Sequence, residues 1–217
     1  MTSQTPSPRP YRGVPADQRR ARRRAALLEA GLQLLGTRGW AATTVRGVCA
    51  QAGLNDRYFY ENFPDRDALL LAIIDEQAAQ GTAQILDAAG RSPRHLRERT
   101  RAAVAATVDF LSEDPRRGHI LAHEFPAAPL LQERRRKIIH TLADIFTAQT
   151  HELVDRVALS DTDLRLTALT LTAGVWELLT DWFRGDLDIG RDHLVDYTVA
   201  LILTTTELAA KARPDLV

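Results

Sequence analysis

The sequence has very little cysteine: Cys49 is the single one among 217 residues, so an intrachain disulfide is impossible. Such a chain fits a reduced compartment like the cytoplasm. No apolar run approaches the roughly 20 residues that a membrane-spanning helix needs. The N-terminus is rich in proline and arginine and lacks an apolar segment, so we expect no secretory signal. Together these absences predict a cytoplasmic protein that does not enter a membrane.

Sequence motifs of the common enzyme classes are also absent. There is no Gly-rich nucleotide fingerprint, no phosphate loop and no Ser-His-Asp order. No segment alternates apolar and polar residues between hairpin turns, and the chain contains no internal repeat. We therefore predict an all-α protein of about nine helices. We also expect that it is not an enzyme and holds no cofactor.

Net charge is lacking overall, because 28 basic residues balance 28 acidic ones. The charges are nevertheless unevenly distributed. Up to Leu70 there are 11 arginines and 6 acidic residues, whereas the rest of the chain holds 17 basic and 22 acidic residues. A positive first third on a negative remainder is typical of a DNA-binding module joined to an acidic body, although chance variation is the alternative.

The stretch Thr43–Phe63, which reads TTVRGVCAQAGLNDRYFYENF, predicts two short helices joined by a turn. In its first half the apolar residues are spaced to lie on one helical face, and a threonine is placed to cap the helix. Gly53 supplies the positive φ that a tight turn needs. The second helix begins near Asn55. The residues expected to face outward from it are Arg57, Tyr58 and Tyr60. This pattern predicts a helix-turn-helix.

The flanking segments extend this pattern in a fixed order. An amphipathic helix precedes the stretch, and another helix follows it. The ordered set is Gly39, Thr43-Thr44-Val45, Ala52-Gly53-Leu54, Tyr60, Phe63, Arg66 and Leu69-Leu70. Over residues 20–72 the chain thus resembles the TetR family of bacterial transcriptional regulators. The resemblance implies an N-terminal three-helix DNA-binding domain and a C-terminal helical domain for ligand binding and dimerisation.

We accordingly expect three parts along the chain: a disordered basic arm over 1–16, a helix-turn-helix domain over 17–64 and a helical ligand-binding and dimerisation domain over 65–217. The arm contains Arg9 and Arg12, and five more arginines follow over residues 19–24. These cations either lie against DNA phosphates, with the arm in the minor groove, or form a solvated charged surface.

Residue chemistry assigns side chains of the second short helix to DNA. Arg57 can pair with guanine and Asn55 with adenine, and the two tyrosines can reach a phosphate or a thymine methyl group. For Tyr60 a core position is the alternative. The resemblance adds phosphate or backbone contacts for residues outside that helix. The full expected DNA-binding set is Thr43, Thr44, Arg46, Asn55, Arg57, Tyr58, Tyr60 and Arg66. Arg57 stands where the family often has glycine, so the operator cannot be inferred from other members.

Helical spacing of apolar residues continues through the rest of the chain. Asp17, Asp65, Ser92-Pro93 and Ser160-Asp161 are predicted helix starts, and the sequence from Phe125 to Pro129 is a predicted break. The expected longer helices cover about 17–38, 65–89, 92–113, 130–159, 162–184 and 192–212.

The resemblance implies a homodimer that binds a near-palindromic operator and is released by a small-molecule ligand, as a repressor would be. The expected dimer interface is formed by helices 162–184 and 192–212, which are apolar around more of their circumference than one core contact requires. The ligand pocket would lie among the middle helices, where aromatic residues favour an apolar or aromatic ligand. The candidate lining residues, each of which can equally be core, are Phe110, His123, Phe125, Trp176 and Leu179.

His119 and His123 lie four residues apart on a presumed helix, beside Glu124, and this spacing can chelate a metal. No third ligand is evident nearby, so we expect an ordinary histidine pair and no metal site. Two alternative functions stay open. One is a small all-α enzyme assisted by a metal at these residues, and the other is a helical adaptor that no longer binds DNA. The basic first third favours a DNA-binding regulator over the adaptor.

Overall fold

Helices form all the regular structure in the computed structural model of the protein, which describes residues 15–154 and 159–211. The prediction of an all-α fold is therefore confirmed. The elements are α1 (Ala16–Arg38), α2 (Val45–Ala52), α3 (Asp56–Tyr60), α4 (Arg66–Arg91), α5 (Leu96–Glu113), α6 (Pro115–His119), the π-helical turn η1 (Ile120–Glu124), α7 (Phe125–Ala127), the 3₁₀ turn η2 (Pro129–Leu131), α8 (Gln132–Leu153), α9 (Asp161–Arg184) and α10 (Arg191–Lys211). None of these helices combines the length and the apolarity of a membrane span.

Side-chain caps begin the three helices that follow α1. The hydroxyl of Thr44 accepts a hydrogen bond from Gly47 N at 3.0 Å, and Asn55 Oδ1 accepts one from Tyr58 N at 3.2 Å. In the same way Asp65 Oδ1 accepts from Ala68 N at 2.7 Å. Each cap satisfies a backbone donor that has no partner within its helix. Gly53, with φ of 64°, makes the turn between α2 and α3, as predicted.

Several predicted helix ends differ from the observed ones. Asp17 lies inside the first turn of α1, which begins after Pro15 and has no side-chain cap. Ser92 ends α4 instead of beginning α5, because its hydroxyl donates to Ala88 O, and α5 starts only at Leu96. The predicted 130–159 helix ends at Leu153. Residues 155–158 lie outside the described part of the chain.

The predicted break between Phe125 and Pro129 is shorter than expected. Phe125 and Pro126 are still helical in α7, where proline occupies a position near the N-terminus that needs no N–H. The chain leaves the helix at Ala128, which has an extended backbone with φ of −107°. Between α6 and α7 the turn η1 is π-helical, a local form often found at functional sites.

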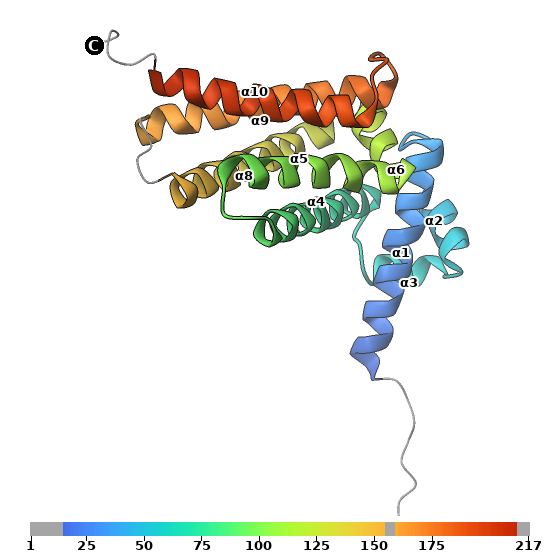
Figure 1. The fold of residues 1–217 in the computed structure, drawn as a ribbon. Helices are drawn as coiled ribbons and strands as arrows, with labels where there is room; N and C mark the ends of the chain where they lie inside the picture. Colours follow the sequence, from blue (N-terminus) through green and yellow to red (C-terminus); the bar gives the residue numbers. More distant parts are fainter. Residues whose placement is uncertain (1–14, 155–158, 212–217) are drawn as a thin grey trace, which may run out of the picture.

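Figure 1 shows α1, α2 and α3 together at one end of the molecule, with the first half of α1 extending beyond the other two. Helices α4 and α5 run side by side through the body, α8 packs against α4 and α9, and α9 lies beside α10 along the opposite edge. One apolar cluster joins α1–α3 to the first turns of α4, and it also takes in Ile120, Phe125 and Leu131. A second cluster joins α5, α9 and α10.

Helix α4 therefore belongs to both halves of the molecule. Its Leu69, Leu70 and Ile73 are buried with the aromatic residues Phe59 and Phe63 of the α3 region. Farther along, α4 packs on α5 and α8. A domain boundary between residues 64 and 65 stays a prediction. Nearly all of the predicted basic arm, residues 1–14 with Arg9 and Arg12, lies outside the described residues.

Candidate nucleic-acid interface and apolar cavity

The exposed side of α3 carries Arg57 and Tyr60, two of the three side chains that were expected to face outward, whereas Tyr58 is half-buried. Asn55, as the N-cap, holds the first turn of α3 through its Oδ1. Arg57 is 84% exposed and Tyr60 is 59% exposed, whereas Phe59 between them is buried against Phe63. A short helix that buries one aromatic residue and exposes a cation and a phenol on the other side has the donors that base edges and phosphates accept.

Glu61 ties the arginines of α1 to α3. Its carboxylate lies 3.1 Å from Arg57 Nε and 3.7 Å from Arg23 Nη2, and its backbone carbonyl accepts from Arg20 Nη2 at 3.0 Å. The guanidinium of Arg23 also stacks on the ring of Tyr58, 4.5 Å from its centroid. Tyr58 is consequently half-buried. These contacts place Arg20 and Arg23 of α1 beside α3.

The turn before α2 is held from inside by Thr43 and Arg66. Thr43 is fully buried and its hydroxyl donates to Gly39 O at 2.8 Å, so this hydroxyl does not face an approaching phosphate. Arg66 stacks on Trp40 at 4.5 Å and donates to Thr43 O at 2.9 Å. Both residues therefore position the turn. Thr44 and Arg46, by contrast, are exposed at the start of α2.

Cys49 on α2 is buried in the core of the same three helices. Burial, as the largest cause, and the neighbouring carboxylate of Asp56 together raise the pKa of its thiol to about 11. The thiol is thus protonated at neutral pH, as expected for a small buried core residue and not for a reactive one.

A cavity of about 270 Å³ lies among α4, α5, α8 and α9. Four of the five predicted pocket residues line it: Phe110, Phe125, Trp176 and Leu179. The fifth, His123, does not line it and is exposed on the outer side of η1. Its sequence position beside buried residues was misleading, because in η1 the inward-facing residues are Ile120, Leu121 and Ala122.

The walls of the cavity are mainly apolar. On α4 the lining runs from Ile74 to Ala89, which corresponds to about 22 Å of helix. Threonines also line it, but those at 107, 150, 172 and 198 donate their hydroxyls to carbonyls one turn earlier in their own helices. They therefore present mostly methyl groups to the interior. A mainly apolar space that follows α4 over this length suits an extended hydrocarbon chain.

The end of the cavity nearest α1 is aromatic. Phe125 and Trp176 meet edge to face, with centroids 5.0 Å apart, and Phe110 packs on the backbone of Gly81. Arg117 stacks on Phe110 at 3.9 Å and donates to Gln77 Oε1 at 2.9 Å. Arg117 and Gln77 also border a polar cleft next to α1, so they form a wall between that cleft and the cavity.

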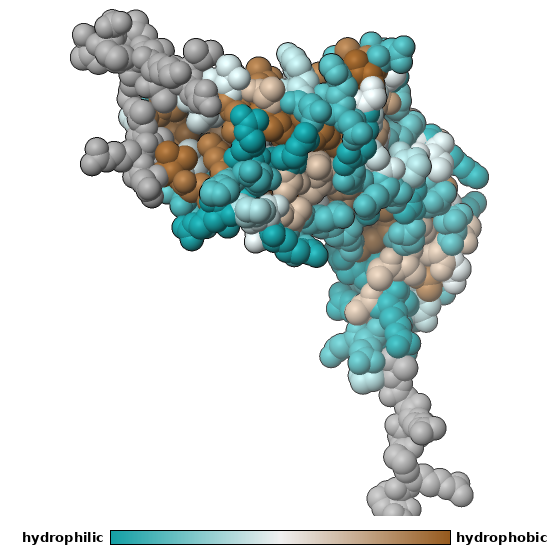
Figure 2. All heavy atoms as spheres, viewed as in Figure 1, coloured by the Kyte–Doolittle hydropathy of each residue, from teal (hydrophilic) through white to brown (hydrophobic). Residues whose placement is uncertain are grey.

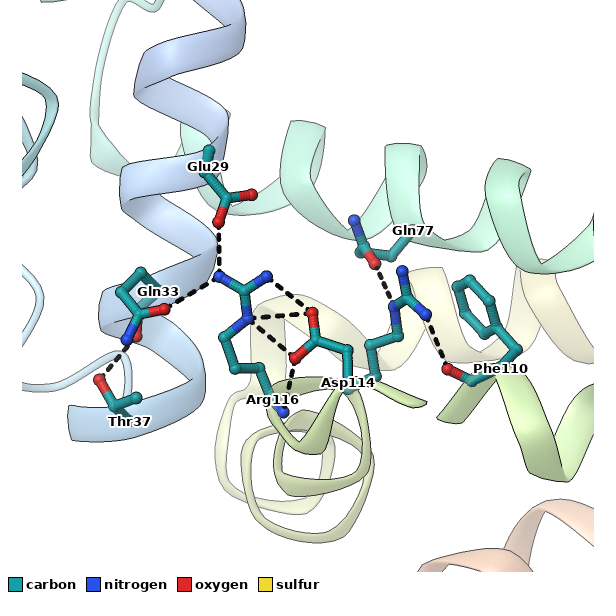
Figure 3. A network of polar contacts seen from close by, with 8 residues as sticks. Glu29, Gln33, Thr37, Gln77, Phe110, Asp114 and Arg116 are labelled. Atoms are coloured by element: carbon teal, nitrogen blue, oxygen red, sulfur yellow. Dashed lines mark hydrogen bonds and ion pairs between the residues drawn. The ribbon is translucent and has the colours of Figure 1, made fainter. Parts of the chain in front are cut away.

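Helix α6 connects this end of the cavity to α1 through Arg116, a connection that the sequence did not indicate (Figure 3). Arg116 Nη1 donates to Glu29 at 2.7 Å and to Gln33 at 3.0 Å, and the same guanidinium is paired with Asp114. The pairing lowers the pKa of the Asp114 carboxyl below its usual range, mainly through the hydrogen bond from Arg116. Gly36 of α1 lies directly against the Arg116 backbone, which leaves no room for a side chain there.

The π-helical turn makes a second connection. Glu124 accepts a hydrogen bond from Trp40 N at 3.0 Å, at the end of α1, while Ile120, Leu121 and Phe125 of the same segment line the cavity. The sequence singled out Glu124 only as a neighbour of His119 and His123. Those two rings lie 4.7 Å apart, and no group of three or more His, Cys, Asp or Glu residues within 15–154 and 159–211 is arranged to hold a metal ion.

Comparison with known proteins agrees with this arrangement. Residues 27–73, from the middle of α1 to the first turns of α4, match the family described as "Bacterial regulatory proteins, tetR family". Over 192 residues the chain is 26% identical to the HTH-type transcriptional activator FasR of Mycolicibacterium smegmatis. The aligned region covers 86% of this chain and 82% of the relative.

Two solved structures share the fold along most of the chain. The transcriptional regulator FadR from Bacillus subtilis in complex with stearoyl-CoA has a TM-score of 0.65 and 17% identity, covering 86% of this chain and 97% of that one. AibR in complex with isovaleryl coenzyme A and operator DNA has a TM-score of 0.60 and 18% identity, covering 82% and 97%. At these identities the likeness establishes the common fold.

Proposed function

Because the chain belongs to the tetR family of bacterial regulatory proteins and is a DNA-binding transcriptional regulator, we propose that it represses its target genes as a homodimer that an acyl-bearing small molecule releases from DNA. In this proposal the protein acts by binding and not by catalysis. Residues 17–64 form the DNA-binding domain, and residues 65–217 form the domain for ligand binding and dimerisation. The observation that carries the proposal is the long apolar cavity, which ends beside two direct contacts, one to α1 and one to the turn that follows α1.

The DNA contacts of the proposal come from α2, α3 and the arginines of α1. Arg57 and Asn55 read base edges in the major groove, with Tyr60 and Thr44 on phosphates. Arg46, which is exposed beside Thr44, adds a further contact, and Tyr58 supports Arg23. Thr43 and Arg66 are left out of the direct contacts, because their polar groups already hold the turn before α2.

The ligand of the proposal is an extended acyl chain. Two observations support it: the lining along α4 is mainly apolar over about 22 Å, and two proteins of the same fold are described with acyl-coenzyme A molecules. Such a chain fills the cavity from the α4–α5 corner towards Trp176 and Phe125. The hydrocarbon leaves water as it enters, which gives the main favourable free energy of binding.

Release follows from movement at the aromatic end of the cavity. A ligand that displaces Phe125 or Ile120 shifts η1, and with it the Glu124 carboxylate that holds Trp40 N. Displacement of Arg117 acts on the neighbouring Arg116 and on its partners in α1. The ligand changes operator affinity only to the extent that it binds the shifted conformation more tightly. In the dimer, such a shift changes the spacing of the two α3 helices, which must be about 34 Å apart to read successive major grooves.

Selection of bound fragments from genomic DNA tests the proposal most directly. We expect a near-palindromic site whose half-sites lie about one helical turn apart. Anisotropy with that fragment then measures operator affinity with and without a long-chain acyl-CoA. A loss of affinity of at least tenfold supports release, and a promoter reporter reads the sign of regulation, since the relative FasR is described as an activator.

Two results would contradict the proposal. If no duplex is enriched at low salt, the chain does not read DNA. If operator affinity is unchanged at a ligand concentration that saturates the cavity, occupation of the cavity is not coupled to DNA binding. A useful control is free coenzyme A, which has the same head group without the chain and should leave the operator complex intact.

A further inference from the structure

The cavity has a charged residue near each of its ends, and the two differ in how well their donors are paired. Among the lining residues that the structure describes, Arg99 and Arg117 carry the charges. Arg117, near α1, donates to Gln77 and to the carbonyl of Phe110 and stacks on the Phe110 ring. This guanidinium is thus engaged with the protein and closes its end of the cavity.

Arg99 lies at the opposite end, in the first turn of α5. Its side chain is only 14% exposed, and Nη1 donates to Gln149 Oε1 at 3.0 Å and to Glu152 Oε1 at 3.2 Å on the last turn of α8. Its Nε, however, is buried and has no hydrogen-bond partner among the described residues. A buried, charged N–H group without an acceptor is costly, so an acceptor that arrives with a ligand gains more there than at an exposed arginine.

The most exposed part of the apolar lining lies at this end of the cavity. Leu86, which lines the cavity on α4, is 43% exposed, the largest exposure among the apolar lining residues named for it. Figure 2 shows hydrophobic atoms at the end of the body farthest from α1, where α8 ends and α9 begins. Arg94 stands nearby with 69% of its side chain exposed, and it is linked to the same Glu152. When an amphiphile enters here with its apolar end first, its head group therefore comes to lie beside Arg99.

We propose that Arg99 binds anionic oxygen atoms at the head of the ligand, with the apolar chain directed along α4 towards Trp176. This inference rests on the proposed function in one respect, namely that the ligand occupies this cavity. Carboxylate and phosphate oxygens share the required chemistry, because both accept charge-assisted hydrogen bonds from guanidinium. The ligand is accordingly an amphiphile with an anionic head, and a neutral molecule of the same length is a poor substitute.

Calorimetry on the full-length dimer without DNA tests the inference with three probes of equal chain length: dodecanoate, dodecanoyl-CoA and the neutral dodecanol. We expect the wild-type protein to bind at least one anionic probe about tenfold or more tightly than dodecanol, which corresponds to about 1.4 kcal/mol. In Arg99→Gln that preference disappears while the affinity for dodecanol is unchanged. The matched control is Arg97→Gln, two residues away on the same helix, where the side chain is exposed and does not line the cavity.

The probes also separate the two sources of the anion. A loss confined to dodecanoate assigns Arg99 to a carboxylate, a loss confined to dodecanoyl-CoA assigns it to phosphates, and either supports the inference. An equal loss for dodecanol, or no loss for either anion, overturns it. If Arg99→Gln does not fold, Arg99→Lys replaces it, because lysine keeps the charge and should retain part of the preference for anions. Two results for a folded Arg99→Lys would overturn the assignment of the guanidinium. One is loss of the whole preference, and the other is full wild-type affinity for both anions.

Failure of the wider proposal is recognised separately by operator anisotropy. If an anion binds preferentially but operator affinity does not change, the release mechanism is wrong and Arg99 is still the head-group site. If all three probes bind equally and release the operator, the protein is a ligand-responsive regulator, but Arg99 does not bind the head group. If none of the probes binds, both the ligand class and the head-group site are wrong.

Discussion

Glu61 controls how freely the arginines at the DNA-binding surface can turn towards DNA. In the free protein it is paired with Arg57 and Arg23 at distances of 3.1 and 3.7 Å. Exposed pairs of this kind contribute between about 0 and 1 kcal/mol, so a phosphate or a guanine can replace the carboxylate at little cost. The pairing thus keeps Arg57 aligned along α3 without preventing it from reaching a base.

The first prediction separates base reading from phosphate binding at α3. Arg57→Ala should lose about 1–3 kcal/mol of discrimination between the operator and an unrelated duplex, because arginine contributes that much per guanine. Tyr60→Phe removes one hydroxyl from an exposed ring and should weaken binding to both duplexes alike. Fluorescence anisotropy with both duplexes at one fixed salt concentration measures the two effects. If both variants bind as wild type does, α3 is not the reading helix.

Cys49 gives a second prediction at the residue scale. Because folding raises the pKa of its thiol from 9.0 to about 11, the native state holds the proton more tightly than the unfolded state. The free energy of unfolding should therefore decline as the pH rises from 9 to 11, and Cys49→Ala should decline less over that range. Urea unfolding at a series of pH values measures this difference. Rapid labelling of the folded protein by a thiol reagent at pH 8 would contradict the burial of the thiol.

At the scale of the helices, α6 is packed more tightly than its five residues suggest. Gly118 faces the ring of Phe183 on α9, and Gly36 of α1 faces the backbone of Arg116. A Cβ atom at either glycine overlaps the opposing atoms unless a helix moves. Helix α6 is thus wedged between α1 and α9, so it cannot shift without moving one of them.

This packing predicts opposite effects for two Gly→Ala substitutions. Gly118→Ala should destabilise the protein by about 1–3 kcal/mol, as overpacking in a core does. Gly90→Ala, near the end of α4, meets no atom within 4 Å and should stabilise it by about 0.5–1 kcal/mol, because alanine is the better helix former. Thermal unfolding measured for both variants tests the pair. Equal shifts in Tm would show that α6 has room to move.

The connection from α6 to α1 also predicts a pH dependence. The pKa of Asp114 is lowered in the folded state, chiefly by its hydrogen bond with Arg116, so its contribution to stability is present above the pKa of the unfolded chain and is lost as the pH falls through the folded value. Asp114→Asn should be less stable than wild type at pH 7, and the gap should close in acid. Urea unfolding at pH 7 and pH 3 measures the gap, and a constant difference would refute this assignment.

Much of the element order was accessible from the sequence, because caps and helical spacing are local. Thr44, Asn55, Asp65 and Ser160 all begin helices as predicted. Ser92 did not, since a serine followed by proline can end one helix as well as begin the next. Four of the five residues expected at the ligand pocket line the cavity, and their role in binding a ligand stays a prediction.

The rest of the candidate site required the folded structure. The contacts of Arg116 with Glu29 and Gln33, and of Glu124 with Trp40, join residues more than eighty positions apart, and helical periodicity contains no information about such pairs. The same holds for Arg99, whose charge on an ordinary amphipathic helix is indistinguishable in sequence from a solvated one. Burial alone reveals it.

For the molecule as a whole, the unpaired apolar surface of α9 and α10 is the remaining feature to explain. Leu166 on α9 is 58% exposed, and Tyr197 and Leu201 on α10 are 53% and 39% exposed. Both helices lie at the edge of the body (Figure 1), where a second copy can cover them. We propose that two-fold pairing through this face buries these side chains and fixes the two α3 helices relative to one another.

A substitution in that face should therefore separate DNA reading from folding. Leu201→Glu places a charge in the proposed interface, so we expect monomers at micromolar concentration. Operator affinity should fall at least a hundredfold, because one α3 helix then reads one half-site alone. Sedimentation and anisotropy measure the two quantities on the same sample. Helix content by circular dichroism should remain that of the wild type, since Leu201 is not part of the described apolar clusters.

The matched control is Leu130→Glu. Leu130 is 40% exposed, nearly the same as Leu201, but it lies in the η2 turn instead of on α9 or α10. The same change of charge and polarity at equal exposure should leave both the dimer and the operator complex intact. If Leu130→Glu dissociates the dimer and Leu201→Glu does not, the protein pairs through another face. The half-site spacing found by fragment selection would then have to be explained by that second arrangement.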